Sequence, residues 1–289
     1  SAVIEDMGLL ATSAVIEDMG LLATSAVISD MATLAGSGAT PTLTSIGVSG
    51  NIDVDGTANL DIVDVDGAAN FAANVTFSDG ADIITASAGS QNLRLGENAG
   101  DSITSGGNFN VFAGYNAGTA NTIGDENVAI GHAALATNVA GSKSTAIGQG
   151  ALNVQNKASN AAGDQLNTAV GYHAGVAVTT GIKNTFIGGL SGDATTTAEE
   201  NTAVGYESMT TNTTGGDNSA SGAYSLRMNT TGSNNAAMGY SALEQNTTGG
   251  SNTAVGYKAL EANTTASSNT AVGYQAGYAN TTGTPTTAF

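Results

Sequence analysis

The chain has 289 residues and a formal net charge of −18, with 24 acidic residues against six basic ones. This balance argues against nucleic acid or an anionic membrane surface as the partner. Because Cys is absent, disulfides, thiolate zinc sites and thiol nucleophiles are excluded. Aromatic residues make up only 5% and forty residues are glycine, so bulky side chains for an ordinary enzyme core are scarce.

Residues 1–36 contain a twelve-residue unit three times, as SAVIEDMGLLAT, SAVIEDMGLLAT and SAVISDMATLAG. The run from Ala14 to Met19 suits about two helical turns, and Gly20 suits the C-terminal cap of such a helix. Twelve residues rotate the apolar stripe by about 120°, so a smooth heptad coiled coil is not expected. We predict short helical repeats in 1–36 that lean on copies from other chains. Since the sequence begins inside a repeat without an initiator Met, we expect it to be part of a longer chain.

Residues 37–92 have the pattern of an acidic β-stalk. The stretch NIDVDGTANL recurs eleven residues later as IVDVDGAANF, and Asp-Gly pairs mark turns between short alternating strands. Residues 1–92 contain twelve acidic and no basic residues. Such a shaft repels itself and buries little, so we expect it to be stable only where several chains share one core.

A calcium site in this stalk was weighed against a solvated turn. Asp53-x-Asp55-Gly56 and Asp64-x-Asp66-Gly67 resemble the opening of a calcium-binding loop. Such a loop needs a Glu six residues after its glycine, where this chain has Ile62 and Ala73. We therefore predict turns, and neither a metal nor a cofactor.

A third repeat begins at Leu93 and is clearest in NTAVGYKAL and NTAVGYQAG. One glycine recurs at intervals of 18, 17, 17 and 23 residues, followed by six intervals of 17. These structural glycines are Gly96, Gly114, Gly131, Gly148, Gly171, Gly188, Gly205, Gly222, Gly239, Gly256 and Gly273. A fixed period of this length is the signature of a solenoid. The fold class is therefore all-β, with a parallel β-roll over 93–278 and a C-terminal tail over 279–289.

Seventeen residues suit two short strands and two turns in each coil. The glycine at each turn implies a positive φ or a neighbouring backbone too close for a Cβ. The interval of 23 indicates one coil with six extra residues, somewhere within 149–166. Three and four residues after the glycine, Ala and then Leu or Met are usual, as at Ala259 and Leu260. Two residues after it the side chain varies, so this position is predicted to face solvent.

Alternation along each predicted strand places Thr168, Val170 and Tyr172 on one face, and Asn167, Ala169 and Gly171 on the other. Taking Val as the core residue, we predict that the recurrent Tyr forms a stacked ladder, buried in the coil or between chains. The alternative is an exposed row that stacks on the sugars of a host glycan. The receptor-binding candidates under that alternative are Tyr172, Tyr206, Tyr240, Tyr257 and Tyr274.

Asparagine recurs in two rows, one before each predicted strand and one within Asn-Thr-Thr triplets. Each row predicts a ladder of stacked amides at the strand spacing. The triplets also match the glycosylation sequon, but turn chemistry explains them without modification. The adjacent Thr residues give no flat two-column Thr array, which argues against an ice-binding surface.

Catalysis finds little support in the sequence, and no catalytic residue is predicted. The only two histidines, His132 and His173, are both assigned to the outward variable position of their coils, without a paired nucleophile. The carboxylate pairs Glu199 with Glu200 and Asp125 with Glu126 are adjacent in turns rather than held across a cleft. We expect the chain not to be an enzyme.

The units NTAVGYKAL and STAIGQGAL resemble the head repeats of trimeric autotransporter adhesins. With Tyr after the glycine and Asn-Thr-Thr-Gly between the units, they are still more similar to the repeats in tail-fibre proteins of marine bacteriophages. The resemblance covers Leu93 to about Tyr278. It implies a homotrimer of parallel chains, a left-handed β-roll in each chain and attachment to a host surface. The membrane-anchoring barrel that ends the autotransporter adhesins has no counterpart in the sequence up to PTTAF, which favours the phage fibre.

We therefore expect a structural fibre protein of a phage tail, located in the virion, that mediates host attachment through multivalent trimeric rods. Its expected partners are two further copies of itself, other tail proteins, and a host surface glycan or outer-membrane receptor. No nucleic-acid binding and no membrane insertion are expected. The alternatives are a trimeric adhesin on a bacterial cell surface and a fibre enzyme that degrades polysaccharide.

Overall fold

The computed structural model describes residues 89–156, 163–283 and 287–289. The chain divides into two units, Ser1–Val75 and Thr76–Phe289, and every described residue belongs to the second unit. The predicted helices of 1–36, the Asp-Gly turns and all but the last four residues of the predicted stalk lie outside the described residues.

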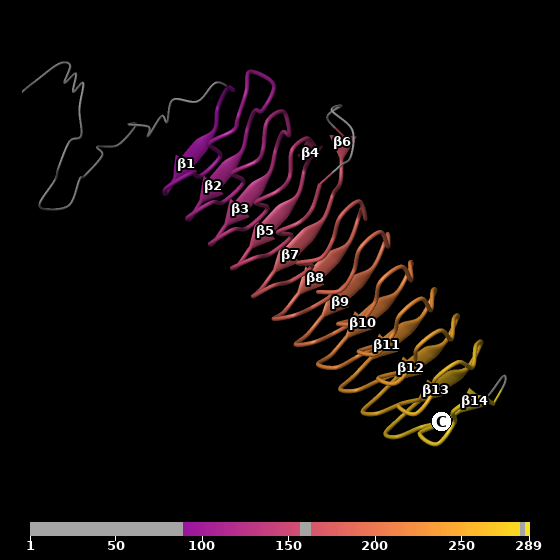
Figure 1. The fold of residues 1–289 in the computed structure, drawn as a ribbon. Helices are drawn as coiled ribbons and strands as arrows, with labels where there is room; N and C mark the ends of the chain where they lie inside the picture. Colours follow the sequence, from indigo (N-terminus) through magenta and orange to yellow (C-terminus); the bar gives the residue numbers. More distant parts are fainter. Residues whose placement is uncertain (1–88, 157–162, 284–286) are drawn as a thin grey trace, which may run out of the picture. The chain divides into compact units, whose positions relative to one another are not determined.

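The described residues form a parallel β-solenoid with about 17 residues per coil (Figure 1). Twelve short strands stack into one parallel sheet in the order β1-β2-β3-β5-β7-β8-β9-β10-β11-β12-β13-β14. The remaining two, β4 and β6, pair with each other in a second sheet at the long coil. The strands are β1 (Leu93–Leu95), β2 (Val111–Ala113), β3 (Val128–Ile130), β4 (Gly141–Ser142), β5 (Thr145–Ile147), β6 (Gly163–Asp164), β7 (Thr168–Val170), β8 (Thr185–Ile187), β9 (Thr202–Val204), β10 (Ser219–Ser221), β11 (Ala236–Met238), β12 (Thr253–Val255), β13 (Thr270–Val272) and β14 (Thr287–Ala288).

Each described coil contains one strand of the main sheet, and among them only the coils with β4 and β6 add a second strand, so the expectation of two strands in every coil was wrong. The second half of the coil is still hydrogen bonded to its neighbour, for example from Leu243 N to Ala259 O at 3.0 Å. It is not extended, because non-glycine residues there have positive φ, such as Lys258 at 55° and Leu260 at 50°. Residues of alternating φ sign cannot form a strand.

The recurring glycine follows the main-sheet strand of its coil at a corner where the backbones of successive coils lie very close together. Gly222 has a φ of 139°, a region that L side chains rarely adopt. A Cβ placed on it would lie 2.5 Å from the carbonyl oxygen of Gly239 in the next coil. The glycine therefore meets both conditions at once, the unusual φ and the backbone contact.

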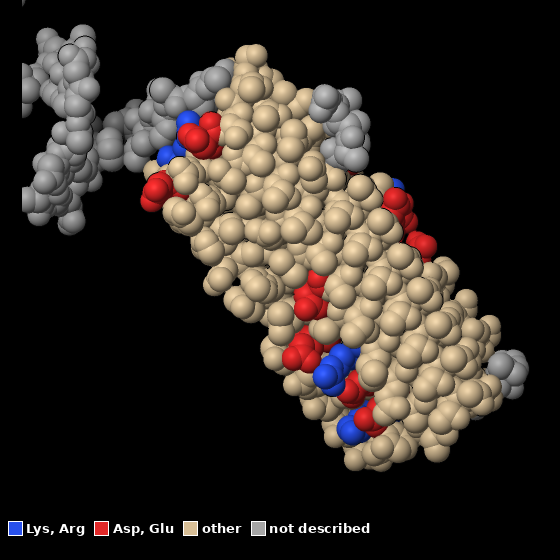
Figure 2. Space-filling model, in the orientation of Figure 1, with Lys and Arg blue, Asp and Glu red and all other residues tan. Residues whose placement is uncertain are grey.

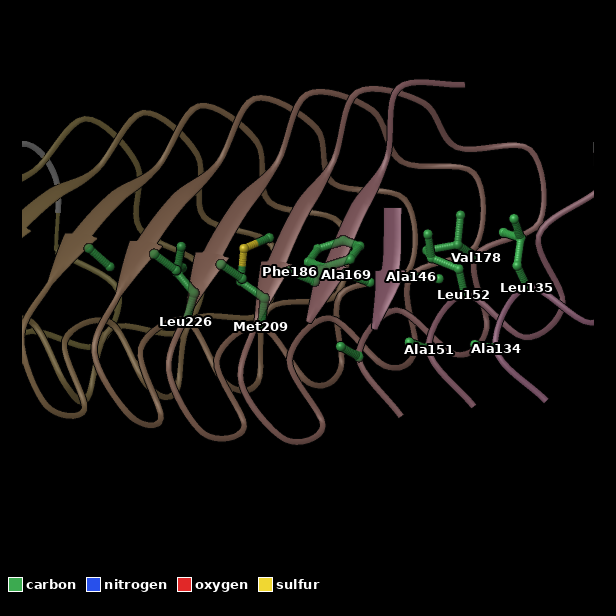
Figure 3. Close-up of a cluster of buried hydrophobic side chains, with 14 of the residues drawn as sticks. Ala134, Leu135, Ala146, Ala151, Leu152, Ala169, Val178, Phe186, Met209 and Leu226 are labelled. Atoms are coloured by element: carbon green, nitrogen blue, oxygen red, sulfur yellow. The ribbon is translucent and has the colours of Figure 1, made fainter. Parts of the chain in front are cut away.

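Apolar side chains, mostly small or medium in size, fill the interior of the stack (Figure 3). In β2, β3, β5 and β7–β13 the middle residue points inward and is usually Ala, such as Ala169 and Ala203. The second contributor is the Leu or Met four residues after the glycine, as at Met209 and Leu226. All four side chains are fully buried, and so are Ala259 and Leu260, which stand three and four residues after their glycine.

Two coils replace the inward Ala by a phenylalanine, and glycine compensates for the added volume. Phe186 stands in the middle of β8, and the Leu positions on either side of it are occupied by Gly175 and Gly192. A Cβ on Gly175 would lie 2.8 Å from the Phe186 ring. Phe112 in β2 has the same arrangement, with Gly100 and Gly118 beside its ring. Interior volume is thus conserved from coil to coil.

In the coils from Asn201 to Asn269, the two predicted asparagine rows form amide ladders inside the stack. In the first row, which precedes the strands, Asn235 Nδ2 donates to Asn218 Oδ1 at 3.1 Å and Asn252 N donates to Asn235 Oδ1 at 3.0 Å. In the second row, Asn246 Nδ2 donates to Asn229 Oδ1 at 2.8 Å. The rows meet at the backbone, because Asn235 and Asn246 both donate to the carbonyl of Gly249.

These ladders satisfy polar groups that are otherwise sealed from water. The triplet asparagines Asn212, Asn229, Asn246 and Asn263 are fully buried, and their amide nitrogens donate hydrogen bonds within the stack. The folded coils therefore leave none of these four sequons accessible to glycosylation.

Because the Phe186 ring fills the space that its flanking glycines leave empty, the stability effects of substitutions at Phe186 and at those glycines should be coupled. Phe186→Ala should lower the free energy of unfolding by about 3–5 kcal/mol, because it leaves a cavity in a fully buried position. Gly192→Leu alone should also destabilise, because the added side chain has no room beside the Phe186 ring. The double variant restores the Ala and Leu pair of most coils, in which Leu also adopts a positive φ.

Chemical unfolding of the parent, both single variants and the double variant closes a double-mutant cycle. The double variant should be more stable than Phe186→Ala. If the two losses simply add, the compensation does not exist.

Candidate functional site

An aromatic column follows the glycine corner along the solenoid. We define it as the aromatic residues that directly follow the recurring glycine, together with the neighbouring Tyr224. The residues that follow the glycine are Tyr115, His132, Tyr172, Tyr206, Tyr240, Tyr257 and Tyr274. Tyr172 is 53% exposed and Tyr274 is 73% exposed in the single chain. The expected burial of the tyrosines within the coil was therefore wrong, while burial between chains stays a prediction.

The error has a structural reason. Residues Thr168 and Val170 do share one face, but that face points outward, while Ala169 and Asn167 point into the stack. Val is thus a surface residue and Ala is the core residue. The alternation also ends at Gly171, whose φ is 142°, so the side chain of Tyr172 cannot be placed by strand parity.

Neighbouring rings in the column contact each other. Tyr240 and Tyr257 stack with centroids 5.5 Å apart, and Tyr257 and Tyr274 stack at 5.2 Å. Tyr224 stands two residues after its glycine and packs edge to face against Tyr206 and Tyr240. Because the faces of Tyr240 and Tyr257 are covered by one another, these rings present their edges and hydroxyls to a ligand, rather than a series of open platforms.

Ion pairs run beside the C-terminal part of the column. Arg227 contacts Glu207 and Glu244, both at 3.2 Å, and its guanidinium lies 5.3 Å from the centroid of the Tyr224 ring. Lys258 contacts Glu261 at 3.0 Å. A hydrogen bond to Glu207 raises the pKa of the Tyr206 hydroxyl, and the negative charge of Glu207 adds to this effect. This part of the column therefore offers phenol groups flanked by compensated charges.

Asp193 is an unusual carboxylate in the neighbouring coil. Burial raises the pKa of Asp193, and the nearby charge of Glu207 acts in the same direction, against the hydrogen bond from Thr210. Its buried Oδ1 has no hydrogen-bond partner among the described residues. The ionised form is thus poorly solvated in the folded chain.

The outer side of the sheet forms a second surface, here called the strand face. It consists of the first and third residues of β1, β2, β3, β5 and β7–β13, and none of these residues is charged. Its third-residue column contains Val, Ile and Met at most positions, with Val204 37% exposed and Met238 59% exposed. The strand face therefore pairs one column rich in Thr with one apolar column, and it is not a two-column Thr array.

The residues two after the glycine were all predicted to face solvent. Gln275 is exposed, and His173, Glu207 and Lys258 are half-buried, but Ser241 is buried. The assignment of both histidines to this position was also wrong, because His132 directly follows Gly131 in the aromatic column. His173 does stand two residues after its glycine.

The residues weighed for catalysis lie apart from one another. Glu199 and Glu200 are exposed, and Glu200 pairs with Lys183. Asp125 is half-buried and accepts a hydrogen bond from the backbone of Asn108 at 2.7 Å. Among the described residues no group of three or more His, Asp or Glu side chains is placed to hold a metal ion.

Comparison with known proteins gave no relative. No family model, no curated protein and no solved structure matches the chain. A search of the described residues for a helix long and apolar enough to cross a membrane found none. The functional argument therefore depends on the geometry of the solenoid.

Sequence reasoning missed two features of this surface. Tyr224 stands one residue out of register with the other tyrosines, yet its ring joins the column. The bridge between Glu207, Arg227 and Glu244 was not foreseen either. Aligning the coils at the 17-residue period places these three charged residues in consecutive coils, and this spacing was the available signal.

The environment of Asp193 predicts a pH-dependent effect on stability. Because the folded-state pKa lies above the ordinary value of 3.8, ionised Asp193 destabilises the fold at pH values above that folded-state pKa. Asp193→Asn should therefore raise the unfolding midpoint at pH 7. This gain should shrink as the pH falls through the raised pKa and vanish below 3.8, where Asp193 is protonated in both states.

Thermal unfolding followed by circular dichroism between pH 3 and pH 8 measures the effect. Glu199→Gln, at an exposed carboxylate, serves as the control and should show no comparable gain. A gain for Asp193→Asn that is equal at pH 3 and pH 7 would contradict the argument.

Proposed function

We propose that the chain is a structural fibre protein of a phage tail that attaches the virion to its host. In this proposal three parallel chains form a homotrimer, which carries the aromatic columns along its length. Other tail proteins hold the fibre at the virion, and the far partner is a host surface glycan or an outer-membrane receptor. The chain itself performs no catalysis.

The observation that carries the proposal is the strand face. A chain of net charge −18 presents an uncharged, partly apolar surface that continues over successive coils. Continuous apolar patches on a surface mark interaction sites. Since every coil repeats the same surface, a second and third copy of the chain satisfy it along the same length. A trimer contact through this face leaves the charged groups in water.

The charge pattern supports this orientation. Each described Lys and Arg contacts a carboxylate: Arg94 with Asp101, Lys143 with Asp164, Lys183 with Glu200, Arg227 with Glu207 and Glu244, and Lys258 with Glu261. The described coils therefore offer no basic stripe for nucleic acid. Figure 2 shows the charged residues as small islands on a largely uncharged surface.

Repetition supplies the mechanism of attachment. Each coil contacts only its neighbours, so the solenoid extends without changing its surface. The aromatic column presents tyrosine edges in several coils, and a trimer presents three such columns. Weak contacts repeated in this way give an avidity that exceeds the affinity of any single contact.

Two other functions follow from related arguments. A trimeric adhesin on a bacterial surface uses the same strand face and the same columns, and differs in what anchors the fibre. A polysaccharide-degrading fibre requires paired carboxylates in a cleft, whereas Glu199 and Glu200 are exposed neighbours. The phage fibre is favoured over both because of the resemblance of its repeats.

A single charge on the strand face tests the assembly. The parent chain should have a native mass of about three times 28.2 kDa. Val204→Glu places a carboxylate at the same position in three neighbouring chains, so the trimer should dissociate while the coil remains folded. Thr214→Glu, an exposed position in the second half of the coil, should leave the trimer intact. Light scattering and circular dichroism measure mass and fold, and a folded monomeric parent would contradict the proposal.

Adhesion of the purified protein to bacterial cells tests the function. Labelled trimer should bind a susceptible host and compete with virion adsorption, and the dissociated Val204→Glu chain should bind about 100-fold more weakly because avidity is lost. Labelling with an antibody to the chain should mark tail fibres in electron micrographs of virions. Labelling of the bacterial surface would favour the adhesin, and loss of polysaccharide viscosity would favour the enzyme.

A further inference from the structure

A hollow of about 270 Å³ interrupts the aromatic column near its N-terminal end. It spans three consecutive coils and contains both histidines of the chain. Its lining consists of His132, Ala133, Gln149, Gly150, Asn153, His173 and Val176.

The hollow exists because two coils lack a large side chain at the same position. Two residues after the recurring glycine, some coils carry a large side chain, such as Tyr224 or Lys258. The two coils at the hollow carry Ala133 and Gly150 at this position. The imidazole of His173 lies over Gly150, where a Cβ would come within 2.6 Å of its Cδ2 atom. The small residues form the floor of the hollow, and His173 closes one end.

Both imidazoles are held by neighbouring rings. His132 stacks on Tyr115 with centroids 5.6 Å apart, and His173 stacks on Tyr172 at 4.0 Å. Within the described residues, no hydrogen bond involves a ring nitrogen of either histidine. The two rings are therefore positioned by stacking, while their nitrogens remain available to a ligand.

The lining restricts the chemistry of that ligand. It contains no Asp, Glu, Lys or Arg, so a charged ligand finds no counter-ion. It offers amides instead: Asn153 uses its Nδ2 to donate to Ala133 O at 2.8 Å, which leaves its Oδ1 as an acceptor, and Gln149 adds a second amide. Two histidines without a third His, Asp or Glu nearby make a poor metal site.

We infer that this hollow binds one neutral sugar ring of a host glycan. A pyranose has apolar C–H surfaces for the imidazole rings and hydroxyls for the ring nitrogens and amides. The volume lies just below the range of pockets that hold drug-sized ligands, which suits a single ring. The choice of a glycan as ligand rests on the proposed attachment function, whereas the geometry of the hollow does not.

The two histidines provide a direct readout, because the chain contains no others. Methyl glycosides of glucose, galactose, mannose and N-acetylglucosamine are titrated into the full chain labelled with ¹³C-histidine. At least one should shift both imidazole signals, with a dissociation constant on the order of millimolar. Zn²⁺ is titrated separately, and a response to Zn²⁺ without a response to any sugar would overturn the inference in favour of a metal site.

Two matched variants locate the effect. Ala133→Tyr places in the hollow the residue found at the equivalent Tyr224, and both backbones have a similar positive φ, 54° and 61°. It should weaken the sugar response at least 10-fold while the fold is kept. Gln275→Tyr introduces the same side chain at the equivalent, exposed position of a distant coil and should leave the response unchanged. A full response in Ala133→Tyr would overturn the site.

The inference and the proposed function fail separately. Adhesion of the parent protein to cells with no sugar response at the histidines would reject the hollow and leave attachment standing. A sugar response that Ala133→Tyr abolishes, in a protein that adheres to no cell, would support the hollow and reject host attachment.

Discussion

Successive coils meet backbone to backbone at the corner after each strand, and the rest of the solenoid depends on this contact. A methyl group at Gly222 would strike the carbonyl of Gly239, so no other residue permits the same spacing. Once the corner is fixed, the strands pair in an unshifted register, as Thr202 does with Ser219. The interior side chains, the asparagine rows and the surface columns therefore all repeat with the same period.

Close spacing leaves a narrow interior, and this explains a composition that is poor in bulky residues. Two Ala and one Leu fill a typical coil, as Ala254, Ala259 and Leu260 do, and a phenylalanine enters only where glycine leaves space beside it, as around Phe186. Many of the remaining buried side chains are asparagines, which satisfy the backbone at the turns and one another along the stack. A narrow interior of this kind is thus stabilised by repeated hydrogen bonds as well as by apolar burial.

The period, its recurring glycine and its asparagine rows were predictable from sequence, because each is a property of one coil that is repeated many times. The orientation of Val and Tyr was not, because alternation alone does not say which face of a strand points inward. Ala169 and Val170 are both apolar, and only the width of the interior decides that Ala is the one enclosed. The pairing of Arg227 with carboxylates in two other coils depends on the stacking geometry.

The coil with six additional residues does not change the register of the strands on either side of it. Strand β5 still pairs with β7 residue for residue, Thr145 with Thr168 and Ile147 with Val170, although 23 residues rather than 17 separate the partners. Backbone hydrogen bonds also resume at once after the added residues, as from Gln165 N to Ser142 O at 3.0 Å. The part of the coil between β5 and β7 therefore tolerates added sequence. A guest peptide grafted there would be displayed beside an undisturbed scaffold.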